Sequence, residues 1–174
     1  HPAYRQKKRR INYDLTLYLG SGMSMRRAAK LLKVSYSTVS RRLKYLGEQC
    51  RAKLDKQYSE VSGLGKFEFD ELQSIEHTKC KPLAIAVAVN PENRHILGFE
   101  VSSMPATGHL AKIARKKYGF RPDKRRVGLM RMFEKMRPMI REEALVLSDL
   151  CPFYQGVVRR CFPKASHRQV LGEK

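Results

Sequence analysis

The chain has 174 residues, of which 42% are apolar and 30% charged, so wholesale disorder is excluded and one or two small folded domains are expected. Its 36 Lys and Arg residues against 16 Asp and Glu give a net charge of +20, which predicts a polyanionic partner. The longest apolar run, 83–89, is too short to span a membrane, and the four cysteines form no CxxC pair, so we expect a cytoplasmic protein without a membrane partner.

A helical pattern fills the first part of the chain, where residues 1–58 hold 15 basic and 3 acidic side chains. Three helices are predicted, at 12–19 (or 14–19), 25–32 and 36–46. Gly20 and Gly22 end the first, and Ser24 and Ser35 are suitable N-caps for the second and third. Gly47 is expected to end the third helix or to bend it into a basic continuation.

The stretch 24–47 has the pattern of a helix-turn-helix. Ala29 is small enough for the point where the two helices would cross, and the apolar residues Leu32 and Val34 flank the turn. Val39 and Leu43 are predicted to face the preceding helix. A plain helical hairpin with a basic, solvated face is the alternative interpretation.

Hydroxyl and cationic side chains are predicted on the exposed face of the third helix, where they would contact double-stranded DNA in the major groove. These residues are Tyr36, Ser37, Ser40, Arg41 and Lys44. The basic run 5–10 would follow phosphates or a minor groove, or remain a solvated tail.

After a Ser- and Gly-containing linker at 59–65, the remaining residues, 66–174, alternate strand and helix patterns. Strands are predicted at 67–72, 83–89, 95–103, 143–149 and 166–170, and helices at 107–118, 123–139 and 152–162. We write this order as βββαβαβ, an α+β or α/β arrangement with a mixed sheet. The segment 112–141 holds 12 basic and 2 acidic residues and is a second candidate DNA contact.

Two acidic residues stand in apolar strand segments, Asp70 within the first and Asp149 at the end of the fourth. In a βββαβαβ fold of the ribonuclease H type these strands are neighbours, so the two carboxylates would lie close together and share Mg²⁺ or Mn²⁺. Such ions activate the nucleophile and stabilise the leaving oxygen in phosphodiester transfer. The alternative is structural, with Asp149 as a cap and Asp70 facing an edge. Glu71 is predicted to point to the opposite face of the sheet.

The residues that suggest a family are the helix-turn-helix pattern and three segments, FDELQSIEHTKCKPLAIAVAV (69–89), ILGFEVSSMPATGHLA (96–111) and VLSDLCPFY (146–154). Together they resemble bacterial insertion-sequence transposases of the DDE type, whose cores are related to ribonuclease H and retroviral integrase. The resemblance covers roughly residues 12–170. It implies a nucleoid-associated protein that binds element ends as a homodimer or higher oligomer and catalyses metal-dependent DNA cleavage and strand transfer.

By the same resemblance Asp70 and Asp149 would be the first and second catalytic acids. The candidate for the third is Glu173, which follows Asp149 at a tolerable spacing but has little chain around it for the helix that the family pattern requires. We therefore expect a fragment whose core is incomplete at its C-terminus. The alternatives are a non-catalytic DNA-binding regulator, a degenerate transposase remnant and, more remotely, a ribosomal or structural nucleic-acid protein.

Overall fold

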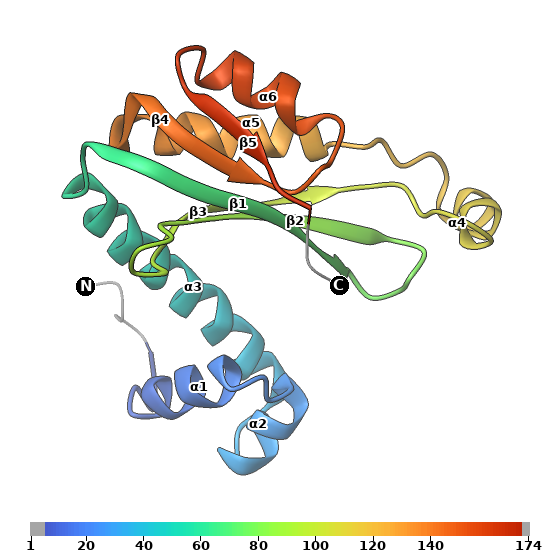
Figure 1. The fold of residues 1–174 in the computed structure, drawn as a ribbon. Coiled ribbons are helices and arrows are strands. Elements are labelled where there is room, and N and C mark those ends of the chain that lie inside the picture. Colours follow the sequence, from blue (N-terminus) through green and yellow to red (C-terminus); the bar gives the residue numbers. More distant parts are fainter. Residues whose placement is uncertain (1–5, 172–174) are drawn as a thin grey trace. The chain divides into compact units, whose positions relative to one another are not determined.

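The computed structural model describes residues 6–171. The chain divides into two compact units, and the boundary between them falls between residues 57 and 58 of the sequence. The first unit is helical and the second contains a five-stranded mixed sheet, so the chain has an α+β architecture (Figure 1). Within the described residues, every helix falls short of the length or the apolarity that a membrane span requires.

The first unit has three helices, as the sequence predicts: α1 (Ile11–Gly20), α2 (Met25–Leu31) and α3 (Tyr36–Ser59). Both predicted N-caps are present, because the hydroxyl oxygens of Ser24 and Ser35 accept hydrogen bonds from backbone N–H groups three residues further on. Of the two outcomes expected at Gly47, the continuation is present and the helix end is not. Helix α3 runs through Gly47 to Ser59, since one exposed glycine costs only about 1 kcal/mol against the twelve helical residues that follow it.

The core of the first unit is small and is built from four buried side chains, those of Leu15, Ala28, Ala29 and Val39. Leu32 and Val34 pack against it at the turn between α2 and α3, as predicted. Leu43 is 40% exposed, and the expectation that it faces the preceding helix is wrong. The helical period places Leu46 against the core instead, together with a buried Arg42 one turn earlier.

The second unit contains the five predicted strands: β1 (Leu64–Ile75), β2 (Pro82–Val89), β3 (Ile96–Ser103), β4 (Ile140–Ser148) and β5 (Ser166–Gln169). Their order in the sheet is β3-β2-β1-β4-β5. The first three strands pair antiparallel, whereas β4 pairs parallel to both β1 and β5. The first and fourth strands are therefore neighbours, as predicted.

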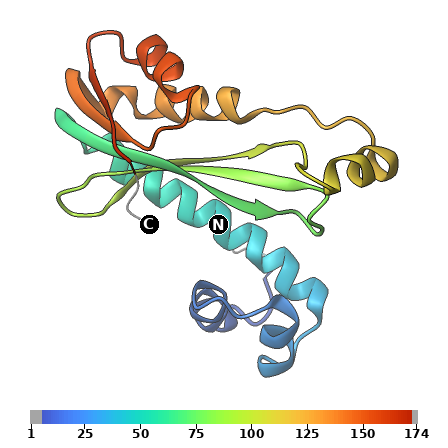
Figure 2. The same cartoon turned by 45° about the vertical axis from the view of Figure 1, so that its right-hand side comes forward.

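The helices of the second unit are α4 (Leu110–Tyr118), α5 (Arg125–Met136) and α6 (Tyr154–Cys161), with a short 3₁₀ helix at Arg137–Met139. Helices α5 and α6 lie on one face of the sheet, and α4 lies beyond the end of the sheet (Figures 1 and 2). The core between the sheet and α5 and α6 holds an aromatic cluster of Phe67, Phe69, Phe133, Tyr154 and Phe162.

Helix α5 comes close to β3 because Gly128 has no side chain where Ser102 of the strand lies. The apolar side of α5 is made by Leu129, Met132, Phe133 and Met136, which are all buried. Val127, next to the glycine, is 48% exposed. The side of α5 that faces the sheet therefore includes Gly128 and not Val127.

Candidate functional site

The parallel pairing of β1 with β4 brings Asp70 and Asp149 to the same end of two neighbouring strands. The register pairs Glu68 with Leu147, and each aspartate follows two residues further along its own strand direction. Alternate residues of a strand share a face, so Asp70 lies on the same face as Glu68. Both aspartates line one hollow, which lies on the sheet face opposite α5 and α6. The predicted juxtaposition of the two acids is therefore present.

We call this region the acidic hollow. Its acidic lining residues are Glu68, Asp70 and Asp149, and its remaining lining is mostly apolar, from Leu72, Val87, Val89, Leu147 and Val170. No Lys, Arg or His side chain lines the acidic hollow in the part of the chain that the structure describes. A phosphate group entering it would therefore meet only negative charge, unless a cation accompanied it.

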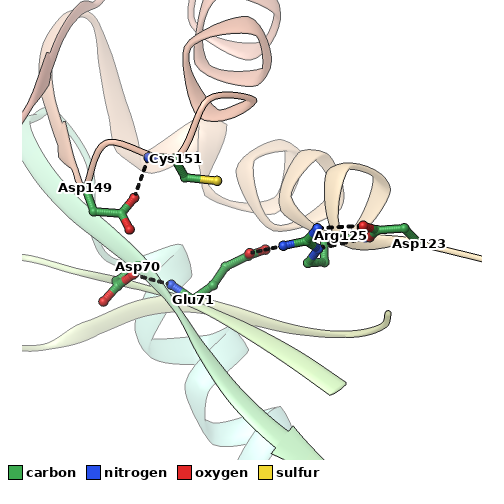
Figure 3. A network of polar contacts seen from close by, with 6 residues as sticks. All are labelled: Asp70, Glu71, Asp123, Arg125, Asp149 and Cys151. Atoms are coloured by element: carbon green, nitrogen blue, oxygen red, sulfur yellow. Dashed lines mark hydrogen bonds and ion pairs between the residues drawn. The ribbon is translucent and has the colours of Figure 1, made fainter. Parts of the chain in front are cut away.

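Each aspartate is oriented by one backbone hydrogen bond. The Asp149 carboxylate accepts from the N–H of Cys151 at 3.1 Å, and the Asp70 carboxylate accepts from the N–H of Glu71 at 2.6 Å (Figure 3). A carboxylate offers about four lone-pair sites, so one hydrogen bond leaves capacity for a cation. The loop that carries Asp149 is held in turn by Gln169 of β5, whose amide donates to the Asp149 backbone carbonyl at 2.8 Å.

No group of three or more His, Cys, Asp or Glu side chains in residues 6–171 is placed to hold a metal ion by itself. The predicted third acid, Glu173, lies outside the described residues. Glu68 was not singled out from the sequence. Its position two residues before Asp70 in an alternating strand is the signal that identifies it as a same-face neighbour.

Glu71 leaves β1 on the face covered by helices, as predicted, and points away from Asp70 (Figure 3). Its carboxylate lies 4.0 Å from the guanidinium of Arg125 on α5, and Tyr154 of α6 is close enough to favour its charged form. Burial raises the pKa of Glu71 despite the opposing effects of Arg125 and Tyr154. The environment therefore disfavours the charge that Glu71 carries.

Arg125 is held mainly by another carboxylate, that of Asp123, at 2.6 Å. This hydrogen-bonded pair lowers the pKa of Asp123 and raises the pKa of Arg125. The guanidinium also lies over the ring of Phe153, 5.3 Å from its centroid. This network of Asp123, Arg125 and Glu71 joins the start of α5 to β1 beneath Asp70. The network was not predicted, because Glu71 is far from the other two residues in the sequence.

The side chains predicted to contact DNA lie at the start of α3. Tyr36, Ser37, Arg41 and Lys44 are exposed, and Ser40 is half-buried. The turn before α3 contains Lys33 with a φ of 50°, a left-handed conformation that usually favours glycine. Arg41 is anchored by its Nε, which donates to the backbone carbonyl of Ser37 at 3.4 Å.

Arg42 is only 7% exposed and holds the segment before α1 against α3. Its guanidinium donates to the side chains of Gln6 and, at 3.1 Å, Asn12, and to the backbone carbonyl of Lys7. The exposed basic residues 7–10 therefore leave from a fixed point on this unit. Their companion Arg5 lies outside the described residues. The helical spacing of Val39, Arg42 and Leu46 is the sequence signal for this buried arginine.

Comparison with protein-family models and with curated proteins finds no match to this chain. The functional assignment therefore depends on the residues and on their placement.

Proposed function

We propose that this chain is a DNA transposase, or part of one, that binds double-stranded DNA through a helix-turn-helix formed by α2 and α3. The second unit would be a ribonuclease H-like core that cleaves and transfers phosphodiester bonds. The observation that carries the proposal is the pairing of β1 with β4, which sets Asp70 and Asp149 in one hollow. A protein that only binds DNA has no need for carboxylates gathered on two neighbouring strands.

Asp70 and Asp149 are the residues that would hold Mg²⁺ or Mn²⁺. Magnesium in proteins is commonly bound by one or two carboxylates, with water and substrate phosphate as the other ligands. Two oriented carboxylates in an acidic hollow fit that donor set. The ion would supply charge stabilisation for phosphodiester chemistry, and the two aspartates would fix its position relative to the sheet.

Binding to DNA tests the first half of the proposal. A duplex selected from a random pool should bind more weakly as salt increases, because Lys and Arg contacts release counterions. Arg41→Ala should weaken binding to the selected duplex by about 1–3 kcal/mol and leave binding to random duplex much less affected. The exposed Arg159→Ala in α6 is the matched control. Equal losses on both duplexes would make Arg41 a phosphate contact.

Metal-dependent cleavage tests the second half. The selected duplex should be nicked in Mg²⁺ or Mn²⁺, and Asp70→Asn or Asp149→Asn should abolish nicking while binding persists. Glu71→Gln is the control, since its carboxylate points to the other face. Within residues 6–171 no three His, Cys, Asp or Glu side chains are placed to hold a metal ion together, and this favours one alternative, a non-catalytic DNA-binding regulator or transposase remnant. Sequence-selective binding without nicking would establish that alternative.

A further inference from the structure

A second hollow lies between α4, the segment that follows it, and the end of the sheet near Lys81 and Ser103. We call it the α4 hollow. It has a volume of about 420 Å³, which is in the range of ligand sites. The acidic hollow is lined by residues of β1, β2 and β4 and by Asp149 and Val170, which follow β4 and β5, and the two hollows share no lining residue.

The α4 hollow is positively charged. Its lining includes Lys81, Arg115, Arg121 and Lys124, and no Asp or Glu among the described residues contributes to it. Helix α4 carries three further basic side chains and no acidic one. The only acid that pairs with these lining cations in residues 6–171 is Glu76, which binds Arg121 at 2.6 Å and Lys81 at 3.9 Å.

Glu76 pairs with only two of the four cations that line the hollow, Arg121 and Lys81. Arg121 is committed to the structure, because it also donates to the backbone carbonyls of Met104 and Pro82. Arg115 and Lys124 have no acidic partner within ion-pair distance among residues 6–171. These two cations are therefore available to an anionic ligand.

Aromatic rings stand beside the cations. Phe120 lines the hollow and is 79% exposed, which makes it the most exposed of the large apolar side chains in the described part of the chain. Gly119, with a φ of 77°, is the C-cap of α4 and stands immediately before Phe120. The ring of Tyr118 is already covered by Lys81, 4.7 Å from its centroid, and so forms a wall of the hollow.

We propose that the α4 hollow binds an unpaired nucleotide of single-stranded DNA, with Arg115 and Lys124 on the phosphate and Phe120 stacked on the base. Cations beside an exposed aromatic ring are the common chemistry of single-strand binding, because every base has a stacking face. A plain anion site has no need for an exposed phenyl ring, and a duplex keeps its base faces stacked inside. The choice of DNA as the strand rests on the proposed function, whereas the nucleotide chemistry does not.

The test compares a fluorescent oligothymidylate with an abasic oligonucleotide of equal length, both bound to the full chain in a metal chelator. The chain should bind the oligothymidylate about tenfold more tightly, because only this strand has bases to stack. Phe120→Ala should bind the two oligonucleotides equally, whereas Phe120→Trp, which keeps an aromatic ring, should keep the difference in affinity. Leu171→Ala, which removes a similarly exposed apolar side chain, is the matched control and should retain it.

Arg115→Ala should weaken binding of both oligonucleotides equally, since both carry phosphates, whereas Arg159→Ala should change neither. Equal affinity of the unmodified chain for the two strands, or preference retained in Phe120→Ala, would overturn the proposal. The measurement does not depend on a metal ion, on duplex DNA, or on Asp70 and Asp149. Its failure therefore leaves the nicking experiment unaffected. Failure of nicking likewise leaves base-dependent binding at Phe120 intact.

Discussion

Asp70 and Glu71 are consecutive residues of one strand, but they lie in different surroundings on the two faces of the sheet (Figure 3). Glu71 is on the face covered by α5 and α6, close to Arg125 and Tyr154, and burial raises its pKa. Asp70 is exposed on the opposite face and lines the acidic hollow. The comparison teaches that β1 packs one face into the core and leaves carboxylates exposed on the other.

The largest expected effect is on the stability of the covered face. Phe69 is 3% exposed and packs its ring against Phe133, with centroids 5.0 Å apart. Phe69→Ala should lower the free energy of unfolding by about 3–5 kcal/mol, through lost burial and a cavity. Leu72→Ala, on the opposite face and 58% exposed, should cost less than about 1 kcal/mol. Urea unfolding measures both variants, and similar losses would mean that the two faces are equally buried.

The next effect separates the two carboxylates. The raised pKa of Glu71 means that its ionised form is disfavoured by folding, so Glu71→Gln should increase stability at pH 7 by up to about 1 kcal/mol. Below the unfolded-state pKa of 4.5, Glu71 is protonated in both states and this gain should disappear. Asp70→Asn should change stability little at either pH, because its side chain is exposed.

Thermal melts with and without Mn²⁺ extend the same comparison to metal binding. Mn²⁺ should raise the midpoint of the unmodified chain and of Glu71→Gln by mass action, but not that of Asp70→Asn. A metal shift that survives in Asp70→Asn and is lost in Glu71→Gln would exchange the roles assigned to the two faces.

The sequence predicts most of the local structure, since the signals are local. Alternation in FEFDEL places Asp70 and Glu71 on opposite faces, and Ser24 and Ser35 mark helix starts. The neighbouring positions of β1 and β4 follow from the topology expected for this strand order. The exposure of Leu43 was wrongly predicted, because a helical face is set by its packing partners. The sequence left open whether α3 ends or continues at Gly47, because a single glycine costs too little to decide between the two.

Long-range pairings were not predictable from one sequence. Arg125 meets Glu71 only because Gly128 lets α5 approach the sheet, and Arg42 meets Gln6 and Asn12 only when α1 has packed on α3. The α4 hollow likewise combines residues around Lys81 with residues 115–124. The basic composition of 112–141 indicated charge there, but the exposure of Phe120 depends on how the chain packs after α4 ends at Gly119.

The smallest expected effect concerns His167 of β5, which stacks on Phe69 on the covered face and lies 2.9 Å from the Ser148 hydroxyl. Burial lowers its pKa below 6.5, so between that value and the folded-state pKa the unfolded chain binds more protons than the folded chain. Stability should therefore fall by a fraction of a kcal/mol as the pH drops through 6.5, and it should be fully present above this pH. Urea unfolding at a series of pH values should show a smaller slope for His167→Gln than for the unmodified chain. His95→Gln, which changes an exposed side chain between β2 and β3, should keep the original slope. An unchanged slope in His167→Gln as well would mean that folding does not disfavour charge at β5. The contrast between the two faces would then be confined to β1 and its immediate neighbours.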